Sequence, residues 1–236
     1  MRLILLCLCI FMGTLYAETS LKERLLNAQP GDYIVTTQGS TTSVLMVRAI
    51  DPPRLILEEI TVPHKTRPSS WKEWVAQKAP GHTGWVAYVF DCENNGLTQC
   101  YSHQQKQFLF VNKADYFLAS LITMPLNPTK ESERKRVGAA PEAGEIDRRK
   151  IWLPSLIREG KKVDAPRFDI MRAKWPSDKT LLAGCTIELY LDSELAFPFP
   201  YWLEVQSPHY TFKIHAVDSG RGMVSPMPYV GSTASK

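Results

Sequence analysis

The sequence lacks the short signatures by which many enzymes and metalloproteins are identified. It contains no His-Glu-x-x-His, no Gly-x-Ser-x-Gly, no Gly-x-x-x-x-Gly-Lys and no dinucleotide-binding glycine fingerprint. Cys-x-x-Cys is also absent, and the histidines do not recur at metal-ligand spacing, so a closed structural zinc site is not expected. These absences favour a non-enzymatic protein, and we predict no catalytic, cofactor-binding or metal-binding residue and no cofactor.

Long apolar runs are also absent after residue 17. No later segment has 18 consecutive apolar residues, so no transmembrane anchor is expected. The net charge is only +4, which does not favour nucleic acid as a partner. The Asn-x-Thr triplet at residues 127–129 contains the proline that prevents N-glycosylation. The lack of an acceptor site favours a bacterial envelope over a eukaryotic secretory route.

The N-terminus has the pattern of a cleavable export signal. A basic residue precedes an unbroken apolar run over residues 3–12, and Ala17 is a small residue at the expected cleavage position. The run is too short to span a bilayer, which needs about 20 residues. Cys7 and Cys9 lie inside the run and each follows a leucine, so no lipid anchor is expected there. We predict a signal peptide over residues 1–17 and a periplasmic or secreted protein.

Cysteine is scarce in the remaining chain, where only Cys92, Cys100 and Cys185 occur. An odd number in an oxidising compartment allows at most one internal bridge. Cys92 and Cys100 flank the tight-turn signal at residues 94–96, so a disulfide across that hairpin is the preferred pairing, although it requires a bulge. Three buried, reduced thiols are the alternative.

Residues 18–125 predict an N-terminal β-meander with short helices. Ser20 followed by Glu23, and Ser70 followed by Glu73, are helix-start signals, and a Pro-Gly pair ends each helix. Short runs rich in β-branched residues, separated by turn signals, favour antiparallel strands. The expected strands are 33–37, 43–50, 55–62, 84–90, 97–102 and 107–111, with a further helix at 116–122.

Residues 126–162 predict a basic linker or loop segment, because the pattern of regular structure is lost there. Lysine and arginine recur throughout it, so the positive excess of the chain is concentrated in and just beyond this segment. Such a segment is typical either of a contact for an anionic partner or of a solvated loop. The last stretch, residues 219–236, is rich in Gly, Ser and Pro and predicts a flexible tail.

Residues 163–218 hold the clearest alternation of apolar and polar side chains. Residues 185–192 are apolar at odd positions and mostly polar at even ones, and residues 210–216 alternate in the opposite phase. We expect antiparallel strands that complete the same domain as residues 18–125. One face of these strands should be solvent-facing and carry Glu188 and Asp192. The predicted fold class is mainly β: an antiparallel curved sheet or sandwich with a few short helices (α+β).

Two resemblances follow from these patterns. The segment from Trp175 to Gly184, followed by the Ile187 strand and by Phe199-Pro200-Tyr201-Trp202, resembles exported proteins of unassigned function from chlamydia-type bacteria, which implies no activity. The early meander resembles in outline the open β-barrel of lipoprotein carriers of the LolA and RseB kind, with no diagnostic residue matched. The tryptophan-rich helix and the basic segment depart from the carrier pattern, and a shared fold does not convey function.

The leading hypothesis is an exported, non-enzymatic envelope protein, a binding or carrier-like β domain for a lipid or protein partner. It requires a sizeable apolar cavity on one face of the sheet. The alternative is an exported hydrolase, which requires a pocket that gathers at least two of Glu188, Asp192, His209 and His215. A structural envelope component is the third option, and it requires residues 130–162 to be exposed to an acidic partner. No oligomeric state is predicted.

Overall fold

The computed structural model describes residues 20–111, 116–177, 180–193, 197–207 and 211–229. Within these ranges the chain builds one antiparallel sheet of eleven strands in the order β6-β5-β4-β3-β2-β1-β13-β12-β11-β10-β7. The strands are β1 (Tyr33–Gln38), β2 (Thr41–Asp51), β3 (Arg54–Pro63), β4 (Gly84–Asp91), β5 (Gly96–Ser102), β6 (Gln107–Leu109), β7 (Asn127–Pro128), β10 (Phe168–Lys174), β11 (Thr186–Asp192), β12 (Pro200–Gln206) and β13 (Thr211–Gly220).

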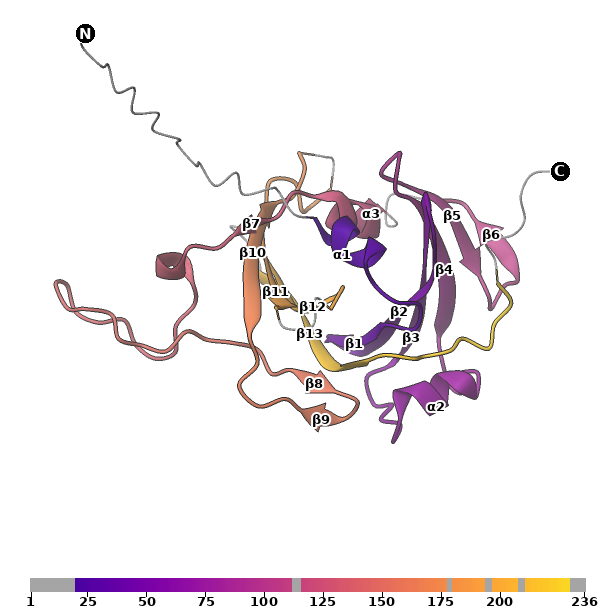
Figure 1. Ribbon diagram of the computed structural model, residues 1–236, viewed down its shortest axis with the longest axis horizontal. Helices are drawn as coiled ribbons and strands as arrows, with labels where there is room; N and C mark the ends of the chain where they lie inside the picture. Colours follow the sequence, from indigo (N-terminus) through magenta and orange to yellow (C-terminus); the bar gives the residue numbers. More distant parts are fainter. Residues whose placement is uncertain (1–19, 112–115, 178–179, 194–196, 208–210, 230–236) are drawn as a thin grey trace, which may run out of the picture.

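The sheet curls into an open barrel whose two edges are not joined (Figure 1). Its N-terminal and C-terminal strands belong to one layer, because β1 pairs with β13. The helices α1 (Leu21–Leu26) and α3 (Tyr116–Thr123) lie in the opening between the sheet edges, while α2 (Trp71–Ala76) lies outside the curve. A separate hairpin of β8 (Ile157–Arg158) and β9 (Lys161–Lys162), and the short 3-10 helix η1 (Glu131–Glu133), complete the described elements. The predicted mainly β fold with a curved antiparallel sheet is confirmed.

A large hydrophobic core fills the concave face of the sheet. Alternate residues of each strand point inward and meet apolar side chains from α1 and α3, as the two-residue period of a strand requires. The buried members include Ile34, Val47, Leu55, Leu57, Ile187, Leu189, Leu191, Leu203 and Val205 from the strands, and Leu21, Leu25, Leu121 and Ile122 from the helices.

A second, smaller core lies on the convex face under α2. Ser70 accepts a hydrogen bond from the backbone N–H of Glu73 at 3.3 Å, which is the helix start expected from the sequence. The helix then buries Trp71, Trp74 and Val75 against the sheet. The tryptophan pair, whose rings meet edge to face at 5.4 Å, is therefore part of the core. None of the helices in the described part of the chain is long and apolar enough to cross a bilayer.

Residues 221–227 lie over the same convex face, although the sequence favoured a flexible tail from residue 219 onward. Met223 is buried in the convex core. Arg48 of β2 donates hydrogen bonds to the backbone oxygens of Ser225 and Met227, both at 3.0 Å. The backbone carbonyl groups of this segment therefore find their hydrogen-bond donor in an arginine of the sheet.

The helix α1 ties together two parts of the open sheet. Lys22 donates to the side-chain oxygen of Asn95 at 2.7 Å, in the turn between β4 and β5. Two residues on, Arg24 donates to the backbone oxygen of Asp192 at 3.1 Å and to the carboxylate of Asp169 at 2.5 Å, on β11 and β10. One short helix therefore contacts strands near both edges of the sheet, where no backbone ladder joins them.

The disulfide predicted between Cys92 and Cys100 is not formed. The hairpin of β4 and β5 turns where the sequence indicated, but Cys100 pairs with Tyr88. Tyr88 precedes Cys92 by four residues, or roughly 13 Å of extended strand. A disulfide needs Cα atoms within about 7 Å. The thiols of Cys92, Cys100 and Cys185 are all buried, so the alternative of three reduced, buried cysteines is the one that the structure adopts.

Candidate ligand-binding cavity

A cavity of about 430 Å³ lies between the concave face of the sheet and the helices α1 and α3. Ligand-binding cavities in proteins commonly measure about 300–1,000 Å³, so a small ligand can be held there. The apolar lining comes from both helices and from strands on both sides of the barrel. Its members are Leu21, Leu25, Ile34, Leu45, Leu57, Phe117, Leu118, Leu121, Ile122, Pro198, Phe199, Pro200, Leu203, Phe212 and Ile214. The apolar cavity required by the leading hypothesis is therefore present.

The helix α3 forms one wall of this cavity and is anchored from behind. Leu121 and Ile122 are buried in the concave core, while Phe117 and Leu118 are half-buried and line the cavity. The ring of Phe117 stacks on Trp175, with centroids 5.3 Å apart and planes 19° from parallel. Stacked aromatic rings hold each other in a defined orientation. This stacking fixes the cavity wall to Trp175, the residue that directly follows β10.

The wall formed by β1, β2 and β3 changes from apolar to polar along its length. On each of these strands the inward-facing residues begin as aliphatic side chains and continue as polar ones. The three series are Ile34, Thr36 and Gln38 on β1, Leu45, Ser43 and Thr41 on β2, and Leu57 and Glu59 on β3. The adjoining strands β13 and β12 stay apolar on this face, with Leu203, Ile214 and Phe212. The cavity can therefore accept an elongated molecule that is mainly apolar and carries a polar group.

Glu59 is the charged residue of this lining among the described side chains. It is half-buried, and its carboxylate accepts a hydrogen bond from the hydroxyl of Tyr88 at 3.1 Å. Leu45 lies directly opposite Glu59 on β2, and Leu57 precedes it on the same face of β3. The carboxylate is thus placed at the boundary between the apolar and polar parts of the wall.

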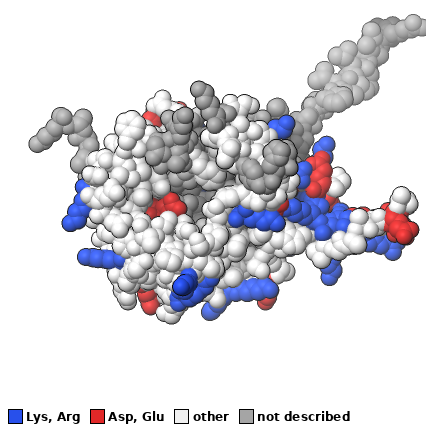
Figure 2. Space-filling model, turned by 180° about the vertical axis from the view of Figure 1, so that it is seen from behind, with Lys and Arg blue, Asp and Glu red and all other residues white. Residues whose placement is uncertain are grey.

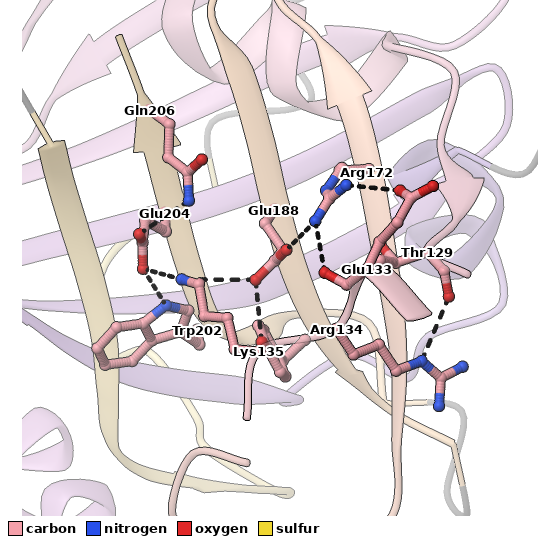
Figure 3. A network of polar contacts seen from close by, with 10 residues as sticks. Thr129, Glu133, Arg134, Lys135, Arg172, Glu188, Trp202, Glu204 and Gln206 are labelled. Atoms are coloured by element: carbon pink, nitrogen blue, oxygen red, sulfur yellow. Dashed lines mark hydrogen bonds and ion pairs between the residues drawn. The ribbon is translucent and has the colours of Figure 1, made fainter. Parts of the chain in front are cut away.

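The carboxylates expected to be solvent-exposed on β11 are instead buried on the convex face. Glu188 pairs across the strands with Glu204, and their side chains are only 2 % and 6 % exposed (Figure 3). Lys135 donates to Glu204 and lies 3.5 Å from Glu188, while Arg172 donates to Glu188 at 3.0 Å. Burial pushes the pKa of Glu204 upward, but hydrogen bonds from Lys135 and Gln206 outweigh it and hold that pKa below its ordinary value. Two buried carboxylates of adjacent strands are therefore paired with cations from elsewhere in the chain.

Aromatic side chains cover this ion network. Trp152 meets the ring of Tyr190 at 5.4 Å and that of Trp202 at 4.9 Å, both edge to face. The hydroxyl of Tyr190 donates to Glu188 at 2.9 Å, and burial together with that carboxylate raises the pKa of the tyrosine. Lys135 also lies 5.9 Å over the ring of Trp152. A distant tryptophan therefore packs on Tyr190, at one of the even positions of β11.

Lys135 of this network comes from a projecting arm, residues 130–153, within the predicted basic segment, whereas Arg172 belongs to β10. Figure 2 shows Lys and Arg gathered along the arm and acidic side chains at its tip. Several of these cations form ion pairs with acidic side chains of the same chain. Arg136 and Arg149 both contact Asp147, whose pKa is held well below its usual value chiefly by the hydrogen bond from Arg149. Lys130, Arg148 and Lys150 are exposed. Part of the basic segment therefore neutralises acidic groups of this chain, which neither sequence alternative anticipated.

The residues named for a hydrolase do not come together. Asp192 binds Arg158 of β8 at 2.7 Å, and His215 lies beside Thr37 at 2.7 Å. Glu188 belongs to the ion network described above, and His209 lies outside the described residues. None of the described three lines the cavity. Within the described ranges, moreover, no three His, Cys, Asp or Glu side chains cluster as a metal ion would require.

A further buried polar group lies on the convex face and was missed by sequence reasoning. Glu58 accepts a hydrogen bond from the indole of Trp85 at 3.0 Å and lies 3.4 Å from the guanidinium of Arg48. His103 is 3.8 Å from the same carboxylate. Burial lowers the pKa of His103, which favours its neutral form although Glu58 acts in the opposite direction. The arrangement satisfies a buried carboxylate and links β2, β3 and β4 to the chain beyond β5.

Comparison with known proteins identifies a family and a fold. The family described as CT021 protein matches residues 43–164, just over half of the chain. The solved structure of the hypothetical protein CT021 from Chlamydia trachomatis matches with a TM-score of 0.65 and 20 % sequence identity, over 91 % of this chain and 98 % of that one. No curated protein matches. The predicted resemblance to chlamydial proteins of unassigned function is confirmed, whereas the likeness to lipoprotein carriers stays a prediction.

Proposed function

We propose that this chain, which belongs to the CT021 protein family, is a non-enzymatic binding protein that holds a lipid-like molecule inside its open barrel. The observation that carries the proposal is the cavity of about 430 Å³ with its mainly aliphatic and aromatic lining. A single acyl chain fits this chemistry, because it is elongated, apolar and able to lie along a curved sheet. In this respect the proposal agrees with the outline resemblance to lipoprotein carriers.

The free energy available from such a cavity sets an upper limit on the affinity for an acyl chain. Each methylene group that leaves water contributes about 0.8 kcal/mol. Ten buried methylene groups would therefore contribute about 8 kcal/mol before the entropic costs of binding are subtracted. A dissociation constant of 1 μM corresponds to about 8 kcal/mol, so ten buried methylene groups give micromolar affinity at most. Affinity in the micromolar range suits a carrier that must also release its ligand.

A carrier function in the cell envelope requires export, which we include in the proposal. Its support is the N-terminal pattern of a basic residue, a short apolar run and Ala17 at the cleavage position. Fractionation of cells that make the protein tests it directly. The protein recovered from the envelope should begin at Glu18, and recovery of the intact N-terminus from the cytoplasm would contradict export.

Ligand binding is tested with the neutral fluorescent probe N-phenyl-1-naphthylamine and by native mass spectrometry of protein from its natural source. The probe should bind at about one site per molecule with increased fluorescence, and the native spectrum should contain a co-purifying lipid. Replacement of Leu45, which lines the cavity, by tryptophan should fill the site and weaken probe binding at least about tenfold.

The matched control is Gln99→Trp, a tryptophan introduced at an exposed position of β5 that does not line the cavity. It should bind the probe as the unchanged protein does. Equal probe binding by the Leu45→Trp and Gln99→Trp proteins, with both shown to be folded by circular dichroism, would refute the cavity as the binding site.

A further inference from the structure

We infer that the ligand of the cavity carries a neutral or positively charged polar group, such as a hydroxyl or an amine, and not a carboxylate or a phosphate. This inference rests on the proposed function, because it concerns the chemistry of the ligand that the same cavity would hold. It comes from the sign of the charge in the lining and from where that charge lies.

The lining formed by the described residues supplies a carboxylate and no cation. Among the described residues around the cavity, Glu59 is the acidic side chain, and no lysine, arginine or histidine lines it. The two basic residues of the nearby helix α1 are used elsewhere, since Lys22 binds the β4–β5 turn and Arg24 binds Asp169 and the backbone of Asp192. An anionic group inside the cavity would therefore meet a like charge without a counter-ion.

The position of Glu59 gives this charge its effect. The carboxylate is half-buried between aliphatic neighbours, where charges interact more strongly than in open solvent. The hydroxyl of Tyr88 donates to one carboxylate oxygen and holds the side chain in place at the concave face. The other oxygen can accept a hydrogen bond from a polar group. The neutral side chains of Thr36, Gln38 and Ser43 on the same wall can accept or donate hydrogen bonds.

The same wall orients an amphiphile. Its aliphatic part is continuous with Leu21 and Leu25 of α1 and with the aromatic and aliphatic side chains of α3. An apolar chain placed beneath these helices leaves its polar end beside Glu59 and the polar residues that follow toward the β1–β2 turn. A ligand with the opposite orientation would bury a polar group under α1 and α3 without a partner, which is costly.

The test compares three amphiphiles with the same twelve-carbon chain: dodecylamine, dodecanol and dodecanoate. Each is titrated at pH 7 against purified protein loaded with N-phenyl-1-naphthylamine, the amine and the carboxylate below their micelle concentrations and the alcohol below its solubility limit. The amine and the alcohol should displace the probe at concentrations about tenfold lower than the carboxylate requires, because like charges brought together inside a protein repel strongly. In Glu59→Gln, dodecanoate should bind about tenfold more tightly, dodecylamine more weakly and dodecanol as before.

The control is Glu73→Gln, which removes the same charge from an exposed position of α2 on the convex face. Its preference among the three amphiphiles should equal that of the unchanged protein. If dodecanoate binds as tightly as dodecylamine, or if Glu59→Gln keeps the original preference, the inference fails and the apolar-cavity proposal stands. If neither the probe nor any amphiphile binds, the proposed function itself fails, and the inference with it.

Discussion

Replacement of Lys135 by methionine should destabilise the folded protein, because Glu188 and Glu204 would lose the cation that they share. The two glutamates lie directly opposite each other on neighbouring strands, where Cβ atoms are about 5 Å apart. Two like charges at that distance repel by about 3 kcal/mol at an effective dielectric constant of 20. Methionine keeps much of the length of the lysine side chain, so the loss reflects mainly the removed charge.

Two features of the site reduce the expected loss. Arg172 still binds Glu188 in the variant, and the side chain of Lys135 is itself 30 % exposed. Removal of one partner from a fully buried ion pair costs about 3–5 kcal/mol. For this partly exposed lysine we expect the free energy of unfolding to fall by about 2 kcal/mol.

The measurement is urea unfolding followed by tryptophan fluorescence at pH 7 and again at pH 4. The folded-state pKa of Glu204 lies below its unfolded value, so its stabilising contribution is present above about pH 4.3 and is lost as the pH falls through the folded value. The variant lacks the lysine that lowers this pKa. The difference between the two proteins should therefore be large at pH 7 and smaller at pH 4.

Lys150→Met is the matched control, because it removes the same charge from an exposed position of the same arm. Its effect should stay within about 0.5 kcal/mol. In addition, the double variant Lys135→Met/Glu204→Gln should recover part of the lost stability. A loss below about 0.5 kcal/mol for Lys135→Met at pH 7, or an equal loss at both pH values, would refute the reasoning.

Three further predictions concern other parts of the fold. Arg24→Ala should lower the free energy of unfolding by about 1–2 kcal/mol and speed release of the bound probe in stopped-flow experiments, since it removes one attachment of α1; unchanged release would show that α1 does not retain the ligand. Burial lowers the pKa of His103, so the free energy of unfolding should fall as the pH drops from 7.5 toward 5.5. In His103→Asn the free energy of unfolding should depend less steeply on pH, and a pH dependence equal to that of the unchanged protein would contradict the assignment. Burial also raises the pKa of Cys92, so iodoacetamide should label Cys92 and Cys100 slowly in the folded protein and completely in urea without reductant; protection in urea would indicate a bridge.

The sequence predicted one face of β11 well and the other badly. Ile187 and Leu189 are buried in the concave core, as their alternation indicated. Glu188 and Asp192 are also buried, because Lys135 and Arg158 come from distant parts of the chain to pair with them. Trp152 packs on Tyr190 between them. Alternation reports that two faces differ in polarity, and it does not report which distant segment will pack against the polar one.

The lining of the cavity was beyond sequence reasoning for a related reason. The strands β1 to β3 are buried on both faces, so polar residues such as Thr36, Ser43 and Glu59 do not reveal which face they occupy. The helix α2 was predictable because its signals are local: a capping serine at Ser70 and a spaced tryptophan pair. The cysteine pair shows the limit of local signals, since the turn was located correctly while the register across it was not.

The attachment of α1 to both sides of the sheet has a mechanical consequence. A closed barrel has a fixed circumference, because widening it would break a continuous ladder of backbone hydrogen bonds. Here the ring is completed by the side chains of Lys22 and Arg24, whose flexible stems can exchange partners one at a time. Widening of the opening between the sheet edges would therefore require displacement of the six-residue helix α1 and would leave every strand pair intact.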